Sequence, residues 1–235
     1  MTTTEYLRSG PTDLEAVVET LCIAFDTDPL LTWNFPRDMA NRAVHVAGFF
    51  RVTVQMILDH GGTVATTPNH EALGVWSPPG EPALGETDEL RFAEALLAAC
   101  GEGGERAVAI MAALAAAHPS DLPPHYHVMF AAVRPEFQFR GHSGAIGHHL
   151  ALTANAEGAG VYAEASNLHT LEVWRRLGLR RRGAEIILPD GGPTLYPIWG
   201  DPGTWSLAGT RPTARRPPPS GRECAARECS RAARW

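Results

Sequence analysis

The chain of 235 residues contains no lysine, so arginine supplies all 20 of its basic side chains. We attribute this bias to GC-rich codons and give it no functional meaning. Cysteine is also scarce, with 4 residues, and only Cys224 and Cys229 lie near each other in the chain. Cys22 and Cys100 stand in apolar helical contexts, so we expect small core residues there and no disulfides.

Long hydrophobic runs are absent as well. A membrane-spanning helix needs ~18 or more apolar residues, and the longest candidate, Ala107 to Ala117, is short and alanine-rich. The N-terminus, MTTTEYLRSG, lacks the basic start and apolar stretch of a secretory signal. These absences predict a cytoplasmic protein with no membrane partner.

Charge is distributed unevenly along the chain, whose formal net charge is −6. Residues 203–235 hold seven arginines and two glutamates, a balance of +5, which leaves −11 for residues 1–202. An acidic body of this kind argues against general nucleic-acid binding. Because proline and arginine replace apolar periodicity after Pro202, we expect one globular domain over 1–202 and a disordered tail over 203–235. A basic arm that binds an acidic partner is the alternative for this tail.

The apolar pattern of residues 1–202 alternates between helical and strand spacing. Asp13 precedes an apolar stripe with helical spacing and is a suitable N-cap. Strands that alternate with helices, after initial helical pairs, predict an α/β fold. The pattern predicts helices over about 14–25, 41–60, 88–99, 105–117, 142–156 and 168–177, and strands over 62–67, 72–76, 125–133, 161–165, 184–188 and 195–199.

A candidate phosphate-binding loop follows the strand predicted over 125–133. Gln138, Gly141 and Gly144 punctuate the entry to the next helix, and Arg140 adds a positive charge. Backbone N–H groups at a helix start are unsatisfied and lie at the positive end of the helix dipole, so they can cradle a pyrophosphate. An ordinary turn between a strand and a helix is the alternative interpretation.

Two histidines on the same strand are candidates for proton transfer. Side chains alternate along a strand, so His125, His127 and Met129 are expected on one side. Imidazole titrates near neutral pH, and the two histidines could therefore relay a proton from a substrate ammonium. Simple hydrogen bonding at a strand end is the alternative. A zinc site is disfavoured because no third Cys or His lies nearby at ligand spacing, so we expect no metal. We interpret Glu164 as a structural carboxylate.

Residues 125–151 resemble the cofactor-binding motif of the GNAT superfamily of acyl-CoA N-acyltransferases, and residues 162–202 resemble its closing half. Gln138, Arg140 and Gly141 match the family's Gln/Arg-x-x-Gly-x-Gly/Ala loop, which binds the CoA pyrophosphate. Further matches are E-A-S-N at Glu164 to Asn167, R-L-G at Arg176 to Gly178, the L-P-D-G-x-P and W-x-D-P segments at Leu188 to Pro193 and Trp199 to Pro202, and A-F-x-x-D-P at Ala24 to Pro29.

The resemblance implies a mixed sheet flanked by helices and splayed between its central strands around the CoA pantetheine. It implies an N-acetyltransferase that moves an acetyl group from acetyl-CoA to an amine of a small molecule or a peptide by direct attack. A backbone N–H near Val133 would polarise the thioester carbonyl. The implied cofactor contacts are Ala131, Val133, Gln138, Phe139, Arg140, Gly141, Ser143, Gly144 and Asn167, and His125 and His127 are the candidate catalytic residues.

Three residues depart from the family pattern. Phe139 is bulky in the phosphate loop, and Ser143 replaces its final Gly/Ala. Trp174 stands where many members carry a tyrosine that protonates the departing thiolate, and an indole N–H cannot take that acid role. A catalytically weak or inactive acyl-CoA-binding or sensory protein of the same fold is therefore the alternative function.

Overall fold

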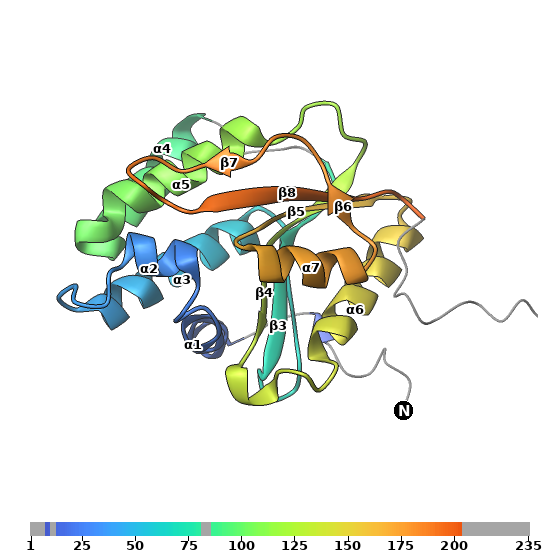
Figure 1. The fold of residues 1–235 in the computed structure, drawn as a ribbon, viewed down its shortest axis with the longest axis horizontal. Coiled ribbons are helices and arrows are strands. Elements are labelled where there is room, and N and C mark those ends of the chain that lie inside the picture. The colour runs from blue at the N-terminus through green and yellow to red at the C-terminus, as the bar shows by residue number, and fades with distance from the viewer. Residues whose placement is uncertain (1–7, 10–12, 81–85, 204–235) are drawn as a thin grey trace, which may run out of the picture.

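The computed structural model describes residues 8–9, 13–80 and 86–203. The tail expected from residue 203 onward, including Cys224 and Cys229, lies outside the described residues after Gly203. The helices are α1 (Leu14–Ala24), α2 (Pro29–Asn34), α3 (Arg42–Asp59), α4 (Glu86–Cys100), α5 (Gly104–Ala117), α6 (His142–Ala156) and α7 (Leu168–Arg176), with 3₁₀ turns η2 (Gly101–Gly103) and η3 (Pro135–Phe137) (Figure 1). The strands are β1 (Arg8–Ser9), β2 (Thr63–Thr66), β3 (Ala72–Ser77), β4 (His125–Val133), β5 (Gly160–Ala165), β6 (Arg180–Arg181), β7 (Ile186–Ile187) and β8 (Thr194–Gly200).

Every helix and strand predicted from the sequence is present, and the differences are confined to short elements. The strand expected over 184–188 shrinks to β7, while β1, β6 and α2 were not predicted. The six-residue helix α2 is too short to show a helical repeat, although Asp28 caps it and Pro29 occupies its first turn. The expected cap of α1 is confirmed, since the Asp13 carboxylate accepts hydrogen bonds from the backbone N–H groups of Glu15 and Ala16.

The sheet is mixed, with strand order β1-β2-β3-β4-β5-β8-β6, and β7 pairs with β8. Within the described chain β4 and β5 form the parallel pair, and the other neighbours are antiparallel. The β4–β5 register runs from His125 opposite Gly160 to Val128 opposite Ala163 and then stops, whereas β4 continues to Val133. The expected splay between the central strands is therefore confirmed, and Figure 1 shows β3 and β4 standing upright while β8 lies across them.

A β-bulge accompanies the splay. Val75 pairs with Phe130 while Trp76 pairs with Val128, so Met129 is an extra residue on β4. A bulge bends its strand and shifts the alternation of side chains. Val128 accordingly packs in the cluster that contains α6, whereas Phe130 packs in the cluster that contains α1 and α3. The strand pattern in the sequence did not reveal this bulge. The bulge marks the point at which β4 leaves β5.

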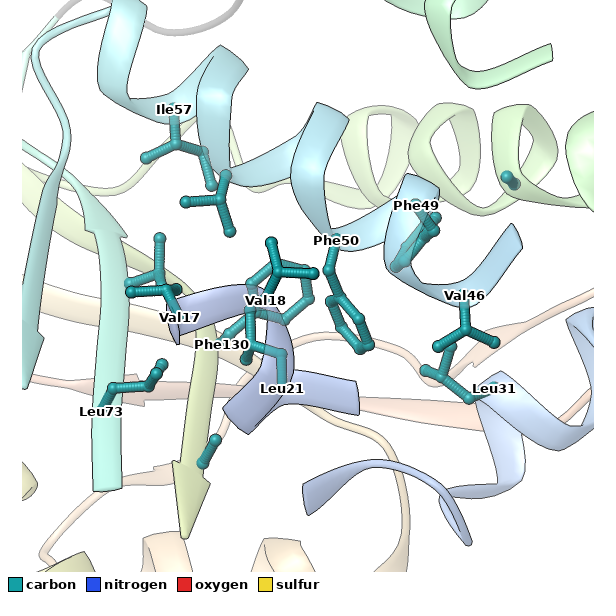
Figure 2. Close-up of a cluster of buried hydrophobic side chains, with 14 of the residues drawn as sticks. Val17, Val18, Leu21, Leu31, Val46, Phe49, Phe50, Ile57, Leu73 and Phe130 are labelled. Carbon is teal, nitrogen blue, oxygen red and sulfur yellow. The ribbon is translucent and has the colours of Figure 1, made fainter. Parts of the chain in front are cut away.

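Helices cover both faces of the sheet. α6 and α7 pack on one face, and α1 and α3 pack on the other, where Phe49, Phe50 and Phe130 form the aromatic centre of a buried cluster (Figure 2). Ring centroids lie 5.4 Å apart for Phe49 and Phe50 and 5.3 Å apart for Phe50 and Phe130, both in edge-to-face geometry. This cluster holds α1 and α3 against the strand that borders the splay.

The cysteine expectation is confirmed for the described part of the chain. Cys100 is fully buried, Cys22 is half-buried against the same core, and both are free thiols. No helix among the described residues is long and apolar enough to span a membrane.

Candidate active site

A pocket crosses the sheet where β4 and β5 separate. Val128 and Trp174, which line it, belong to the cluster on the α6–α7 face. Phe49 and Phe130, which also line it, belong to the cluster on the opposite face. Because one pocket is lined from both faces, two molecules that enter from opposite sides could meet inside it.

The charged residues among those that line the pocket are acidic, namely Asp28 and Glu164. Asp28 follows α1 in the A-F-x-x-D-P segment and caps α2 by accepting the Leu30 backbone N–H at 2.9 Å. Its second carboxylate oxygen accepts the Ser166 hydroxyl at 2.6 Å. Burial raises the pKa of Asp28, and the hydrogen bond from Ser166 partly offsets this effect. The contact joins the N-terminal region to the end of β5 across the pocket.

Glu164 is buried beside His127. Its Oε2 lies 2.9 Å from Nε2 of His127, and the Glu164 side chain is 5% exposed. Its Oε1 is buried without a hydrogen bond of good geometry, and the buried Tyr162 hydroxyl lies beside this carboxylate. Burial alone would lower the pKa of His127, but the charge and hydrogen bond of Glu164 outweigh burial and raise it. The Glu164 carboxylate thus reaches both the pocket and an imidazole.

A third histidine joins His125 and His127. His118 follows the last residue of α5, and its Nε2 lies 3.0 Å from Nε2 of His125. The His118 and His125 rings stack with centroids 5.1 Å apart, and the His118 ring is also 5.1 Å from that of His127. Burial, followed by the neighbouring imidazoles, lowers the pKa of His118 to about 4. The sequence showed no third Cys or His at ligand spacing, but the fold brings His118 together with His127 and Glu164.

The structure places the histidines of β4 and the glutamate of β5 differently with respect to the pocket. His125 and His127 lie on the same side of β4, as expected, but they are not among the residues that line the pocket. Glu164, interpreted from the sequence as structural, is the ionisable residue of this group that lines the pocket. Its place in the E-A-S-N segment was the available signal, whereas no sequence pattern pointed to His118.

The loop that precedes α6 contains two consecutive turns and an exposed aromatic ring. Phe139 has a left-handed backbone (φ 60°) and is 97% exposed, and Gly141 is left-handed with φ 89°. The Arg140 guanidinium lies over the Phe137 ring, 5.3 Å from its centroid. Phe139 therefore points away from the protein.

The first turn of α6 is uncapped. Gly141 occupies the N-cap position, and no side chain accepts a hydrogen bond there. A Cβ atom placed on Gly141 or Gly144 would meet nothing within 4 Å, so the space beside both glycines is open. The amides of Ser143 and Gly144 are first-turn donors of α6, and such donors have no acceptor within the helix. An uncapped helix start of this kind fits an anionic group such as a pyrophosphate.

The free edge of β4 lies next to this loop. The Arg134 N–H donates to the Glu71 carbonyl at 2.9 Å, so Arg134 directs its backbone groups toward β3. Successive residues of a strand face opposite edges, and Val133 and Ala131 therefore direct their N–H groups toward the side from which β5 has diverged. The Gln138 side chain donates to the Val133 carbonyl at 3.4 Å, which agrees with this orientation.

Asn167 and Trp174 both belong to α7. Asn167 caps this helix, because its side-chain oxygen accepts the Thr170 N–H at 2.9 Å and the Thr170 hydroxyl accepts the Asn167 N–H. Its side-chain NH₂ group donates to Ser166 at 3.3 Å. Trp174 is a buried core aromatic, as its position on the helix suggested, and it also lines the pocket.

Neither a protein family nor a curated protein matches the amino-acid sequence. Several solved structures share its fold. They include a histone acetyltransferase HPA2 and related acetyltransferase from Corynebacterium glutamicum, with 17% identity, 88% of this chain and 99% of that chain covered, and a TM-score of 0.56. A polyamine N-acetyltransferase from Drosophila melanogaster, which forms N-acetylagmatine, has 15% identity, covers 83% and 99%, and has a TM-score of 0.54. Arylalkylamine N-acetyltransferase 2 from Aedes aegypti has 10% identity, covers 83% and 98%, and has a TM-score of 0.56.

These likenesses confirm the fold expected from the sequence. The chain has the GNAT fold, a mixed sheet that is flanked by helices and splayed at its centre. The similar structures are acetyltransferases, and the chain spans nearly their whole length.

Proposed function

We propose that this protein is an N-acetyltransferase that moves an acetyl group from acetyl-CoA to the amine of a small molecule or a peptide. The pocket that crosses the sheet is the observation that carries the proposal. It brings Ala131, on the free edge of β4, and the Glu164 carboxylate into one cavity. A thioester held along that edge and an amine held at the carboxylate would therefore meet.

Acetyl-CoA fits the residues around the α6 loop. The first-turn amides of α6 would bind the pyrophosphate, and Arg140, in the loop before this helix, would add positive charge. The free backbone edge at Ala131 and Val133 would bind the pantetheine amides, since an unpaired strand edge offers both donors and acceptors. The remaining proposed contacts are Gln138, Phe139, Ser143, Gly144 and Asn167.

The transfer needs an electrophile, a nucleophile and a proton acceptor. The N–H of Val133 would polarise the thioester carbonyl, while the amine nitrogen forms a bond to the carbonyl carbon. The C–S bond would break, the thiolate would leave with the electron pair, and the second proton lost by the nitrogen would go to this thiolate to give the free CoA thiol. Oε1 of Glu164, which is buried without a hydrogen bond of good geometry, would accept the proton released by the ammonium. His127 holds the other carboxylate oxygen, and His127 and His125 form the proposed relay behind it.

The pocket chemistry favours a cationic amine with a compact apolar body. Asp28 and Glu164 supply negative charge, and Phe25, Phe49 and Phe130 supply apolar and aromatic wall. An ammonium is attracted both to carboxylates and to ring faces. The arylalkylamine enzyme from Aedes aegypti and the N-acetylagmatine-forming enzyme from Drosophila both take amines by name. The apolar walls favour the first kind of acceptor here, because agmatine would bring a second charge into them.

Trp174 favours one alternative. It lines the pocket where many members of the resembled family carry an acidic tyrosine, and its indole cannot donate a proton to a thiolate. A protein that binds acyl-CoA and senses it without turnover would tolerate this residue.

The domain boundary at Pro202, the cytoplasmic location and the absence of a nucleic-acid partner also remain predictions from the sequence.

Thiol release from acetyl-CoA, measured with a panel of amines, tests the proposal. We expect 2-phenylethylamine to be a better acceptor than agmatine, and agmatine to be better than an uncharged amide. Glu164→Gln should lower kcat by about 10²–10⁴-fold, the usual contribution of a general base.

Glu157→Gln is the matched control for this variant. Glu157 lies at the end of α6, accepts a hydrogen bond from Tyr126 and is not among the pocket residues. This variant should retain the wild-type rate. If Glu164→Gln keeps the wild-type rate as well, Glu164 is not the proton acceptor.

A further inference from the structure

Three potential metal ligands converge next to the pocket from three different elements. His118 follows α5, His127 lies on β4 and Glu164 lies on β5. One ligand atom of each lies within 4.8 Å of the others. Tetrahedral zinc has bonds of about 2.0–2.2 Å to nitrogen and oxygen, which places its ligands roughly 3.4 Å apart. Side-chain rotations that move the ligand atoms by about an ångström would bring them to that spacing.

Unsatisfied polar atoms provide a second, independent indication. Oε1 of Glu164 is buried without a hydrogen bond of good geometry, and the buried Tyr162 hydroxyl lies beside this carboxylate. The Glu164 side chain is 5% exposed, and Tyr162 is fully buried. Leaving a buried carboxylate oxygen without a partner is costly, and a cation bound at this carboxylate would satisfy it.

A neighbouring imidazole packs against His118. Nδ1 of His125 lies 2.7 Å from the Pro123 carbonyl, which orients this ring next to His118.

We propose that His118, His127 and Glu164 form a binding site for a divalent transition-metal ion of the zinc type. Two imidazole nitrogens and one carboxylate oxygen suit Zn²⁺ or Co²⁺, whereas Mg²⁺ and Ca²⁺ prefer sites made of oxygen ligands. The fourth coordination position is left for water or for His125. This proposal departs from the sequence-based expectation of no metal.

The site has a consequence for catalysis that rests on the proposed function. The ion and the substrate proton would compete for the same carboxylate, Glu164. Binding of the ion would release any proton held between His127 Nε2 and Glu164 Oε2 and would leave no base for the ammonium. Zinc is therefore expected to inhibit acetyl transfer.

Titration of the full chain with Co²⁺ tests the site without reference to activity. Wild-type protein should bind one Co²⁺ per chain with the intense visible absorption of tetrahedral coordination, and Zn²⁺ should abolish the absorption by displacement. His118→Gln and Glu164→Gln should each weaken binding at least tenfold. His169→Gln, which removes an exposed histidine on α7, is the matched control and should bind like the wild type.

The outcomes separate this proposal from the proposed function. Absence of the absorption in wild-type protein, equal Co²⁺ affinity in folded His118→Gln and Glu164→Gln, or equal preference for Mg²⁺ would each overturn the metal site. Circular dichroism identifies a variant that fails to fold, and the other variant then decides. Metal binding without any acetyl transfer would support the metal site and contradict the proposed enzymatic activity. Acetyl transfer that is insensitive to Zn²⁺ would contradict the predicted inhibition by zinc.

Discussion

Replacing Gly141 with aspartate is expected to weaken acetyl-CoA binding by at least tenfold. The substitution places a carboxylate at the start of α6, in front of the open first-turn amides. Two unit charges about 4 Å apart repel by ~1 kcal/mol in water and by ~4 kcal/mol near a protein surface. Each 1.4 kcal/mol corresponds to about a factor of ten in affinity, so even a partly screened contact with the pyrophosphate gives a measurable loss.

Gly158→Asp is the matched control, because Gly158 follows the other end of the same helix. Both glycines are left-handed, with φ 89° for Gly141 and 65° for Gly158, and a Cβ atom meets nothing within 4 Å at either position. The strain of a non-glycine residue is therefore similar in both variants, and aspartate tolerates this conformation better than most residues. Aspartate at the helix start also favours the helix, which offsets part of this strain in Gly141→Asp.

Calorimetric titration of acetyl-CoA into the wild type and both variants gives the result directly. We expect weak binding for Gly141→Asp and wild-type affinity for Gly158→Asp. Equal affinity for all three proteins would refute the assignment of the α6 loop as the pyrophosphate site, and equal loss in both variants would show that the loss is not local to the loop.

Three further predictions concern other residues. Trp174→Tyr should raise the rate of thiol release if a missing phenol limits the reaction; a folded variant that binds CoA and is no faster than wild type would show that another group protonates the thiolate. Phe50→Ala should lower the free energy of unfolding by about 3–5 kcal/mol in denaturant titration, because it empties the centre of the aromatic cluster; a loss below 1 kcal/mol would contradict the packing. Glu71→Gln should destabilise the protein at pH 7 but not near pH 2. Although burial opposes ionisation, hydrogen bonds from Thr67 and Asn69 lower the pKa of Glu71 from 4.5 to about 2. The stabilisation by the Glu71 carboxylate is therefore present above pH 4.5 and is lost as the pH falls toward 2. Thermal unfolding at the two pH values checks the last prediction, and an equal difference at both would contradict it.

The longer elements of the fold were predictable because local periodicity determines them. β4 and α6 have the predicted bounds, since an alternating apolar strand ends before Pro135 and a new helix begins after Gly141. The short helix α2 and the bulge at Met129 were missed. A six-residue helix lacks a repeat, and a bulge is set by pairing with β3 rather than by the sequence of β4 alone.

The candidate site was predictable only where its residues are consecutive. The α6 loop is one segment, so its open helix start could be anticipated. The cluster beside the pocket combines His118, His127 and Glu164, which no common spacing links. Asp28 and Ser166 are 138 positions apart and meet only because α2 packs near the end of β5. Chain topology, rather than local pattern, decides which ionisable groups share a cavity.

The most direct test of the proposed acetyl transfer is a product balance for the wild-type protein. Acetyl-CoA and 2-phenylethylamine are incubated with the full chain, free CoA is measured by thiol detection, and the N-acetylated amine is measured by mass spectrometry. We predict that both products form in equal amounts, at a rate that rises with amine concentration until it saturates. If the protein binds acetyl-CoA but releases thiol no faster than buffer with any amine of the panel, the transferase assignment is wrong and the chain is an acyl-CoA-binding protein.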